Sequence, residues 1–217
     1  MISTRNPQSL PDKIDLQRIC KAISVMDAII SQEWQFRYYS YISNWDAKEE
    51  CLQMRNGSGD EMHILFLEIG CAINGFCHEL EEKDKTKITS SLPHIFDDFI
   101  FGEPVKSIET TFCLWTEDLK NWQVGELDNY DDNSENMLHI FDGNPKTYCD
   151  WAEDYYELEV SVEIATKIYK GETITREDVL SIAQNVEDWE QLEADLNEIE
   201  FPYNFSAAAK VSKWKFW

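Results

Sequence analysis

The sequence lacks long apolar runs. No window of about 20 apolar residues, the length needed to cross a bilayer, occurs among its 217 residues, so no transmembrane helix is predicted. The N-terminal residues MISTRNPQSLPDK contain no apolar run long enough to form the core of a signal peptide. Together these absences predict a cytoplasmic protein that does not insert into a membrane.

Basic side chains are also scarce. Lysine and arginine number 19 against 42 aspartates and glutamates, which gives a formal net charge of −23. Nucleic acids and anionic membrane surfaces are bound through lysine and arginine, so neither is an expected partner. The same charge would attract a basic protein partner electrostatically. High net charge also serves solubility alone, and that interpretation remains beside the first.

The spacings that usually mark catalytic and metal sites are missing. The chain has no CxxC pair, no HxxxH pair and no GxSxG motif. The glycine-rich run RNGSGDE is not followed by the helix with lysine and serine or threonine that a phosphate loop requires, so a hairpin loop is expected. Cys71, Cys77, His63 and His78 are the best metal candidates, but a strand would point His78 away from Cys71 and Cys77. No catalytic residue, metal site or cofactor is therefore predicted.

The six cysteines are scattered through hydrophobic segments rather than grouped. In a chain expected to remain in a reducing compartment, scattered cysteines are typical of buried thiols and not of a disulfide framework. The six positions are Cys20, Cys51, Cys71, Cys77, Cys113 and Cys149.

What the sequence does contain is enough apolar material for a folded core, with 43% hydrophobic and 13% aromatic residues. Near the N-terminus, Ile19, Ile23 and Met26 recur at steps of three and four and predict a helix over residues 14–30. Asp12 and Asp15 lie where acidic side chains favour a helix start.

Residues 33–45, EWQFRYYSYISNW, are rich in aromatic side chains and predict a β-strand. Both faces of this strand would be partly apolar, as in the centre of a sheet. Residues 56–60 form a turn cluster between two further strand-like runs. The next turn falls either at Ile69-Gly70 or at Asn74-Gly75, and the sequence does not choose between them.

After a polar connection, the spacing of Leu92, Ile95 and Phe99 predicts a helix that ends at Gly102. Residues 108–115 and 122–126 then read as a hairpin. The pattern as a whole predicts an α+β fold, with an antiparallel meander sheet of about five strands flanked by helices and a helix-rich C-terminal half.

Asn144 and Pro145 are a favourable N-cap and first residue for a helix that contains the stretch DWAEDYYELE. Helical spacing divides this stretch into two stripes, with Tyr156 at their border. The apolar stripe, expected to face the core, consists of Tyr148, Trp151, Ala152, Tyr155 and Leu158. The acidic ridge, expected to face solvent, consists of Asp150, Glu153, Asp154 and Glu157.

One domain is predicted over residues 1–217. It comprises an N-terminal helix (1–32), a mainly antiparallel sheet with one helix (33–126), a helical region (134–200) and an aromatic, basic tail (201–217). Because two exposed tryptophans in the tail would be unfavourable alone, the tail is expected to dock on the domain or on a second copy. Both a monomer and a homodimer remain open.

Three blocks carry a family resemblance: MRNGSGDEMHILFLEIGCAINGFCHE, TTFCLW with the following WQVG, and DGNPKTYCDWAEDYY. Through them the chain resembles a family of soluble bacterial proteins to which no activity is assigned, so the resemblance implies no catalytic residue. In composition, an acidic ridge that bears a tyrosine is also similar to the bacterial immunity proteins that neutralise basic nuclease toxins, although no motif of those families is present.

Three functions follow as hypotheses. The first is an acidic interaction protein, of the immunity or inhibitor kind, that binds a basic protein partner. The second is a hydrolase-like enzyme with a site near the sheet, where His63, His78 and Glu79 are the residues to examine. The third is an assembly protein that dimerises through its C-terminal arm. The residues predicted to contact a partner in the first hypothesis are Asp150, Glu153, Asp154, Tyr156 and Glu157, with Asp131 and Asp132.

Overall fold

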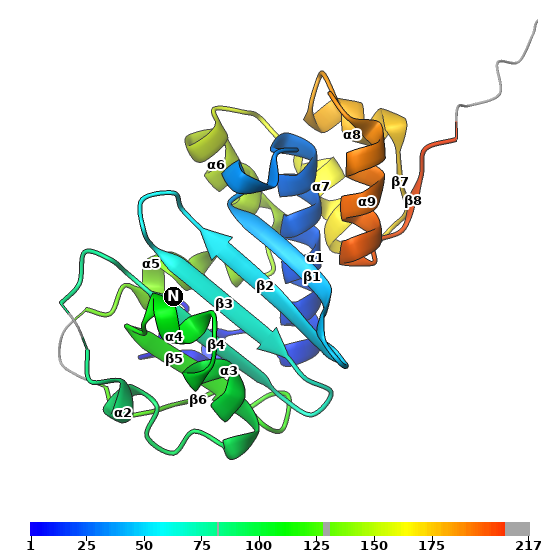
Figure 1. Ribbon diagram of the computed structural model, residues 1–217. Coiled ribbons are helices and arrows are strands. Elements are labelled where there is room, and N and C mark those ends of the chain that lie inside the picture. Colours follow the sequence, from blue (N-terminus) through cyan, green and yellow to red (C-terminus); the bar gives the residue numbers. More distant parts are fainter. Residues whose placement is uncertain (82, 128–130, 207–217) are drawn as a thin grey trace, which may run out of the picture.

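The computed structural model describes residues 1–81, 83–127 and 131–206. One antiparallel sheet has the strand order β1-β2-β3-β4-β5-β6, and helices flank it (Figure 1). The fold is therefore α+β, as predicted, with six strands in the sheet where about five were expected. The strands of this sheet are β1 (Tyr39–Asp46), β2 (Glu49–Arg55), β3 (Glu61–Phe66), β4 (Cys71–Phe76), β5 (Phe112–Thr116) and β6 (Gln123–Val124).

Most of the helices follow the sheet in the chain, as expected of a helix-rich C-terminal half. A short parallel pair, β7 (Ile174–Thr175) with β8 (Tyr203–Asn204), joins the last helices. The helices are α1 (Lys13–Ile30), α2 (Lys85–Ile88), α3 (Asp97–Phe101), α4 (Val105–Ile108), α5 (Ser134–Leu138), α6 (Pro145–Tyr156), α7 (Val162–Tyr169), α8 (Arg176–Ile182) and α9 (Trp189–Ile199). Single 3₁₀ turns occur at Pro7–Ser9, Trp34–Phe36, His94–Phe96 and His139–Phe141.

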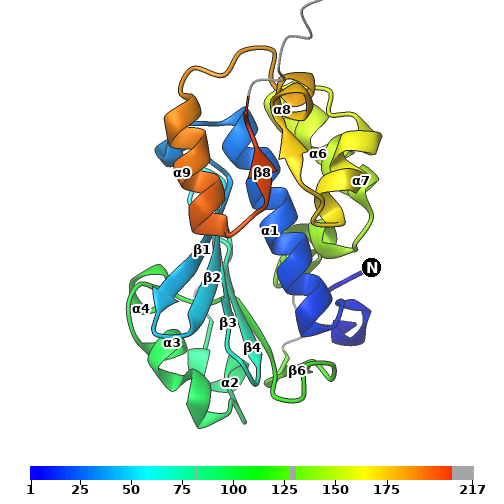
Figure 2. The ribbon, with the colours of Figure 1, turned by 90° about the vertical axis from the view of Figure 1, so that its right-hand side faces the viewer.

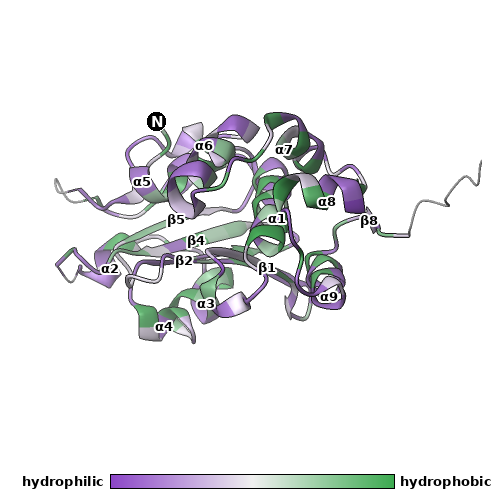
Figure 3. Cartoon of the chain, turned by 90° about the horizontal axis from the view of Figure 1, so that it is seen from above, coloured by the Kyte–Doolittle hydropathy of each residue, from purple (hydrophilic) through white to green (hydrophobic). Residues whose placement is uncertain are grey.

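The sheet separates two helical layers. In Figure 3, α1, α6 and α7 lie above the sheet, and α3 and α4 lie below it. The larger core is on the α1 side, where α1 runs along the sheet (Figure 2) and buries Leu16, Ile23 and Met26 completely. The smaller core, on the other face, packs Phe99 and Ile100 of α3 against the sheet. The two faces therefore have separate hydrophobic clusters and different helices.

The N-terminal helix is confirmed almost to the residue. The side chain of Asp12 caps α1 by accepting a hydrogen bond from the Asp15 backbone N–H at 2.9 Å. This bond satisfies one of the N–H groups that a helix start leaves unpaired. The apolar stripe predicted on residues 14–30 is the face that α1 buries.

The predicted strand over residues 33–45 is wrong in its first half and in its position. Trp34–Phe36 is a 3₁₀ turn, and β1 begins only at Tyr39. The chain turns because the Arg37 guanidinium donates to the carbonyls of Ser31 and Gln32, at 3.0 and 3.1 Å. The strand that follows is an edge strand and not a central one. Its apolar residues are nevertheless covered, because α9 and α1 both pack against β1.

The first hairpin of the sheet has a turn that composition does not mark. The turn between β1 and β2 is formed by Ala47 and Lys48, with Lys48 at a φ of 66°. It contains neither glycine nor proline, so composition gives no turn signal there. By contrast, the predicted loop at residues 56–60 is confirmed between β2 and β3, where Asn56 Oδ1 accepts hydrogen bonds from the N–H groups of Ser58 and Asp60.

The structure chooses between the two alternatives for the next turn. Leu67 N–H donates to the Gly70 carbonyl at 2.9 Å, so the turn lies at Ile69-Gly70, and Asn74 and Gly75 lie inside β4. A β-carbon at Gly75 would come within 2.1 Å of the Phe112 ring on β5. Gly75 is therefore required by a close cross-strand approach rather than by a turn.

Asn144 and Pro145 begin α6 as predicted, with the Asn144 side chain accepting from Lys146 N–H at 3.1 Å. The predicted helical region over residues 134–200 contains α5, α6, α7, α8 and α9. Of the predicted tail, Phe201 and Phe205 are buried in the main core. Residues 207–217 lie outside the described residues, so docking or dimerisation through them stays a prediction.

All six cysteines are buried and free, as predicted for core thiols. Within residues 1–81, 83–127 and 131–206, no helix is both long and apolar enough to span a membrane.

Candidate protein-binding surface

Helix α6 is fixed in its rotation by a buried carboxylate on α1. Asp27 accepts hydrogen bonds from the hydroxyls of Tyr148 and Tyr156, at 2.6 and 3.0 Å, and from the backbone N–H of Tyr39, at 2.7 Å. Tyr148 and Tyr156 lie at the two ends of α6, and Tyr39 is the first residue of β1. One side chain therefore ties α1, α6 and the edge strand together.

Burial raises the pKa of the Asp27 carboxyl to about 6, even though its three hydrogen bonds and the positive charge of Arg37 act in the opposite direction. The nearby guanidinium of Arg37 is itself paired with the buried Asp195 of α9, at 2.6 Å. The ionised form of Asp27 is therefore stabilised mainly by hydrogen bonds from neutral donors. Because its pKa is about 6, the protonation of Asp27 within this network changes near pH 6.

This anchoring turns the acidic ridge outward. Asp150, Glu153 and Asp154 are exposed on α6, as predicted, and Asp150 forms a salt bridge with Lys146 one turn earlier, at 2.5 Å. Glu157 is exposed too, but it is the C-cap of α6 with a φ of 54° and does not continue the helix. The ridge therefore consists of three helical acids and one at the helix end.

The two tyrosines at the end of α6 exchange the roles expected from helical spacing. Tyr156, predicted at the solvent border, is half-buried, and its hydroxyl is engaged by Asp27. Tyr155, predicted in the core, is exposed; its ring stacks on Trp151 with centroids 5.2 Å apart and meets Tyr38 edge-on. The reversal follows from Asp27, because a buried carboxylate that needs donors draws the Tyr156 hydroxyl inward.

Tyr155 belongs to an aromatic patch that the sequence did not reveal. The patch comprises Trp34, Phe36 and Tyr155, which are 52%, 66% and 44% exposed. Phe36 and Tyr155 line the same pocket of about 360 Å³, together with Arg55, whose guanidinium lies 3.8 Å from the centre of the Trp34 ring. Residues far apart in sequence thus present three aromatic rings, one of which, Tyr155, lies on α6 between the ridge acids Asp154 and Glu157 in sequence.

The only sequence signal for this patch was the high aromatic content of residues 33–45. In a strand that signal means burial against a sheet, whereas in the observed 3₁₀ turn Trp34 and Phe36 face solvent. Periodicity alone therefore assigned these side chains to the wrong environment.

Asp131 and Asp132 belong to a different element, the segment before α5. Asp131 is exposed. Asp132 is half-buried and has a structural role, because it accepts hydrogen bonds from the hydroxyls of Thr4 and Ser134, at 2.5 and 2.6 Å. Asp132 thus fastens the N-terminal segment to α5, and its carboxylate is already occupied by internal donors.

The residues named for a hydrolase-like site are not brought together by the fold. His63 is buried in β3, on the sheet face that carries α3 and α4, and burial lowers its pKa to about 4. Its Nε2 lies 3.2 Å from Gln53 Nε2, while its Nδ1 finds no hydrogen-bond partner among the described residues. His63 is therefore a neutral core histidine at physiological pH.

His78 and Glu79 are exposed after β4. His78 Nδ1 lies 2.7 Å from Asp60 Oδ1, which also accepts the His78 backbone N–H at 2.9 Å. Although burial alone would raise it, these hydrogen bonds hold the pKa of Asp60 below its usual value. The pair closes the β2–β3 loop against the chain after β4, which is a structural use of a histidine and a carboxylate.

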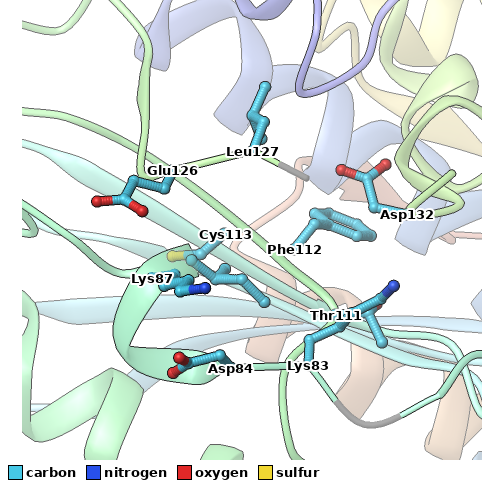
Figure 4. A pocket seen from close by; sticks show the side chains of 10 residues that line it. Lys83, Asp84, Lys87, Thr111, Phe112, Cys113, Glu126, Leu127 and Asp132 are labelled. Atoms are coloured by element: carbon cyan, nitrogen blue, oxygen red, sulfur yellow. The ribbon is translucent and has the colours of Figure 1, made fainter. Parts of the chain in front are cut away.

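A small cavity of about 30 Å³ lies beside Cys113 on β5, with Asp84 and Lys87 on its other side (Figure 4). This volume accommodates only about two water molecules and is too small for a substrate. Burial raises the pKa of the Cys113 thiol to about 12, so its sulfur is protonated at neutral pH and is a poor nucleophile. The cavity does not support the hydrolase-like hypothesis.

No group of three or more His, Cys, Asp or Glu side chains in the described part of the chain is placed to hold a metal ion. In comparisons of the chain with protein-family models, with curated proteins and with solved structures, nothing matches.

Proposed function

We propose that the protein is a small acidic interaction protein of the cytoplasm that binds a basic protein partner through the acidic ridge and the adjoining aromatic patch. An immunity or inhibitor protein, which covers the surface of a basic enzyme, is the most concrete form of this function. The observation that carries the proposal is that α6 exposes both the ridge acids and Tyr155, and that Tyr155 lines a pocket with the exposed Phe36.

The combination resembles the anatomy of a protein interface. Binding energy at interfaces concentrates in a few aromatic and arginine side chains, while charged side chains at the rim set orientation and association rate. Trp34, Phe36 and Tyr155 supply the aromatic anchors, and Arg55 stacked on Trp34 supplies an arginine. The negatively charged rim is formed by Glu153, Asp154 and Glu157, and it favours a positively charged partner.

The acids of the ridge are available for a partner. Among the described residues, Asp150 is the ridge acid that forms a salt bridge within the chain, and that bridge is exposed and therefore weak. The buried free thiols are consistent with the reducing cytoplasm. The fixed rotation of α6 also means that the ridge does not need to be ordered when a partner binds, which lowers the entropic cost of association.

The test uses two variants of equal net charge as baits for proteins from the source organism at low salt. The ridge variant is E153K/D154K/E157K, which leaves the Asp150–Lys146 bridge intact. The scattered variant is E68K/E117K/E172K, whose three positions are exposed and lie in separate loops. The wild-type protein and the scattered variant should retain the same basic protein, and the ridge variant should not.

Loss of the captured protein at high salt is expected as well, because exposed charges are screened beyond about 8 Å at physiological ionic strength. If the ridge variant retains the same protein as the wild type, the ridge is not the binding surface. If no basic protein is retained by the wild type, the proposed function is wrong.

A further inference from the structure

A third pocket, on the α3–α4 side of the sheet, has a mainly basic lining. It has a volume of about 280 Å³ and lies between the end of β4, the chain before α2, and helices α3 and α4. Its charged lining consists of Lys83, Lys85 and Lys106, with Glu109 as the acidic member. Three lysines around one pocket are unexpected in a chain whose acids outnumber its basic residues 42 to 19.

Two of these lysines are not paired directly with a carboxylate within the described residues. Lys85 Nζ donates to the Ile100 carbonyl at 2.6 Å, which is a neutral acceptor, and burial lowers the pKa of Lys85. Neither Lys85 nor Lys106 forms a salt bridge in the part of the chain that the structure describes. The Glu109 carboxylate acts on the Lys85 ammonium without a direct ion pair, and with three lysines against this one acid the pocket lining keeps a positive charge, which favours a bound anion.

The remainder of the pocket is apolar or already hydrogen-bonded. Phe101, which is 47% exposed, and Phe76 contribute aromatic rings, and the Phe101 ring centre lies 5.4 Å from Lys85 Nζ. At the base, the hydroxyl of Thr110 donates to Asn74 Oδ1 at 2.6 Å. The lysine ammonium groups are therefore the main donors for a ligand, and the phenylalanines offer it an apolar surface.

We propose that this pocket binds a small aromatic anion, with its carboxylate or phosphate beside Lys85 and Lys106 and its ring against Phe101. A volume of about 280 Å³ is near the lower end of the range of small-molecule pockets, about 300–1,000 Å³, which suits a ligand of one ring and one anionic group. A polyanion such as a nucleic acid is a poor occupant, because the net charge of −23 repels an extended chain of phosphates.

The experiment titrates the full chain with phenyl phosphate, benzoate, inorganic phosphate and benzyl alcohol, and follows binding by amide NMR shifts. Phenyl phosphate or benzoate should bind saturably, with shifts around the pocket, and the one that binds more tightly identifies the anionic group. Inorganic phosphate lacks the aromatic ring and benzyl alcohol lacks the anionic group, so each should bind at least about tenfold more weakly.

Two variants and a control sharpen this test. K106Q removes an exposed charge at the pocket and should weaken binding by about five- to tenfold, as expected for loss of a charge near the surface. K120Q makes the same change at an exposed lysine in the β5–β6 loop and should leave binding within about twofold. F101A should weaken the binding of the aromatic anions, which lose the ring of Phe101, and should leave the binding of inorganic phosphate unchanged.

The proposal is overturned if neither aromatic anion binds below about 10 mM, a range that includes even weak ligands. It is also overturned if K106Q and K120Q bind the aromatic anions with equal affinity, or if benzyl alcohol binds to the wild type as tightly as phenyl phosphate does. Because the pocket is on the opposite side of the sheet from α6, failure here leaves the proposed function untouched.

Discussion

Each face of the sheet buries an ionisable side chain, Asp27 on one and His63 on the other, and the two groups are held in opposite ways. On the α1 face, Asp27 accepts three hydrogen bonds that connect α1, α6 and β1. On the α3–α4 face, the His63 ring has one side-chain hydrogen-bond partner among the described residues, Gln53, and its Nδ1 is unpaired there. Burial favours the neutral form of both groups, so it raises the pKa of Asp27 and lowers that of His63.

This difference shows how one buried ionisable side chain can set the packing of the elements around it. A carboxylate that joins three elements sets the rotation of α6 and so decides which side chains reach solvent. His63 joins no second helix to the sheet in this way, and buried hydroxyls without partners among the described residues occur on the α1 side as well, at Ser24 and Tyr169. The proposed protein-binding surface lies on the side of Asp27, and the lysine pocket lies on the other.

The largest expected effect separates the two faces directly. Replacing Asp27 with leucine leaves two buried hydroxyls and one buried N–H without an acceptor, and should lower the free energy of unfolding by about 3–5 kcal/mol. Replacing His63 with leucine removes a poorly bonded group and should change it by less than about 1 kcal/mol. Urea denaturation at pH 7 measures both, and equal losses in the two variants would contradict the comparison.

The titration of Asp27 should make the free energy of unfolding depend on pH. Its folded-state pKa of about 6 lies above the unfolded value of about 3.9, so folding takes up a proton between these values. The stabilising contribution is present below pH 4 and is lost as the pH rises through 6. Relative to D27N, the wild-type free energy of unfolding should therefore fall by about 3 kcal/mol between pH 4 and pH 7. A constant difference between the two proteins would show that Asp27 does not titrate in this way.

His63 should make the free energy of unfolding depend on pH in the opposite direction, over nearly the same pH range. Its folded-state pKa of about 4 lies below the unfolded value of about 6.5, so its contribution is present above pH 6.5 and is lost as the pH falls toward 4. Relative to H63Q, the wild type should gain about 3 kcal/mol between pH 4 and pH 7. The same denaturation series measures this, and a slope of the same sign as that of Asp27 would be evidence against the assignment.

A smaller effect distinguishes the two faces as binding surfaces. Phe36 and Phe101 are both exposed phenylalanines, the first in the aromatic patch and the second in the lysine pocket. F36A should weaken binding of the captured basic partner by about 2 kcal/mol, as for an aromatic hot spot. F101A, measured by the same calorimetric titration, should leave that affinity unchanged within about twofold. Loss of affinity in F101A alone would move the interface to the other side of the sheet.

Local chemistry made part of this fold predictable. The Asp12 cap, the loop at Asn56 and the Asn144–Pro145 helix start each depend on neighbouring residues, and all three are confirmed. The outward direction of the acids on α6 was also predictable, because it follows from helical spacing and the charge of the side chains.

Contacts between distant residues were not predictable from one sequence. The exchange of Tyr155 and Tyr156 depends on Asp27, which is 129 positions from Tyr156 in the chain. The 3₁₀ turn that exposes Trp34 and Phe36 depends on how Arg37 is held, including its pairing with Asp195 on α9. The aromatic patch therefore became visible only when three-dimensional neighbours were known.

The central claim, that the acidic ridge recognises a basic partner, is tested most directly by the dissociation constant of the captured partner for the two isoelectric variants. The account predicts at least about tenfold weaker binding and a shallower salt dependence for E153K/D154K/E157K, with E68K/E117K/E172K within about threefold of the wild type. Equal weakening in both variants would mean that net charge alone attracts the partner, and would contradict the claim.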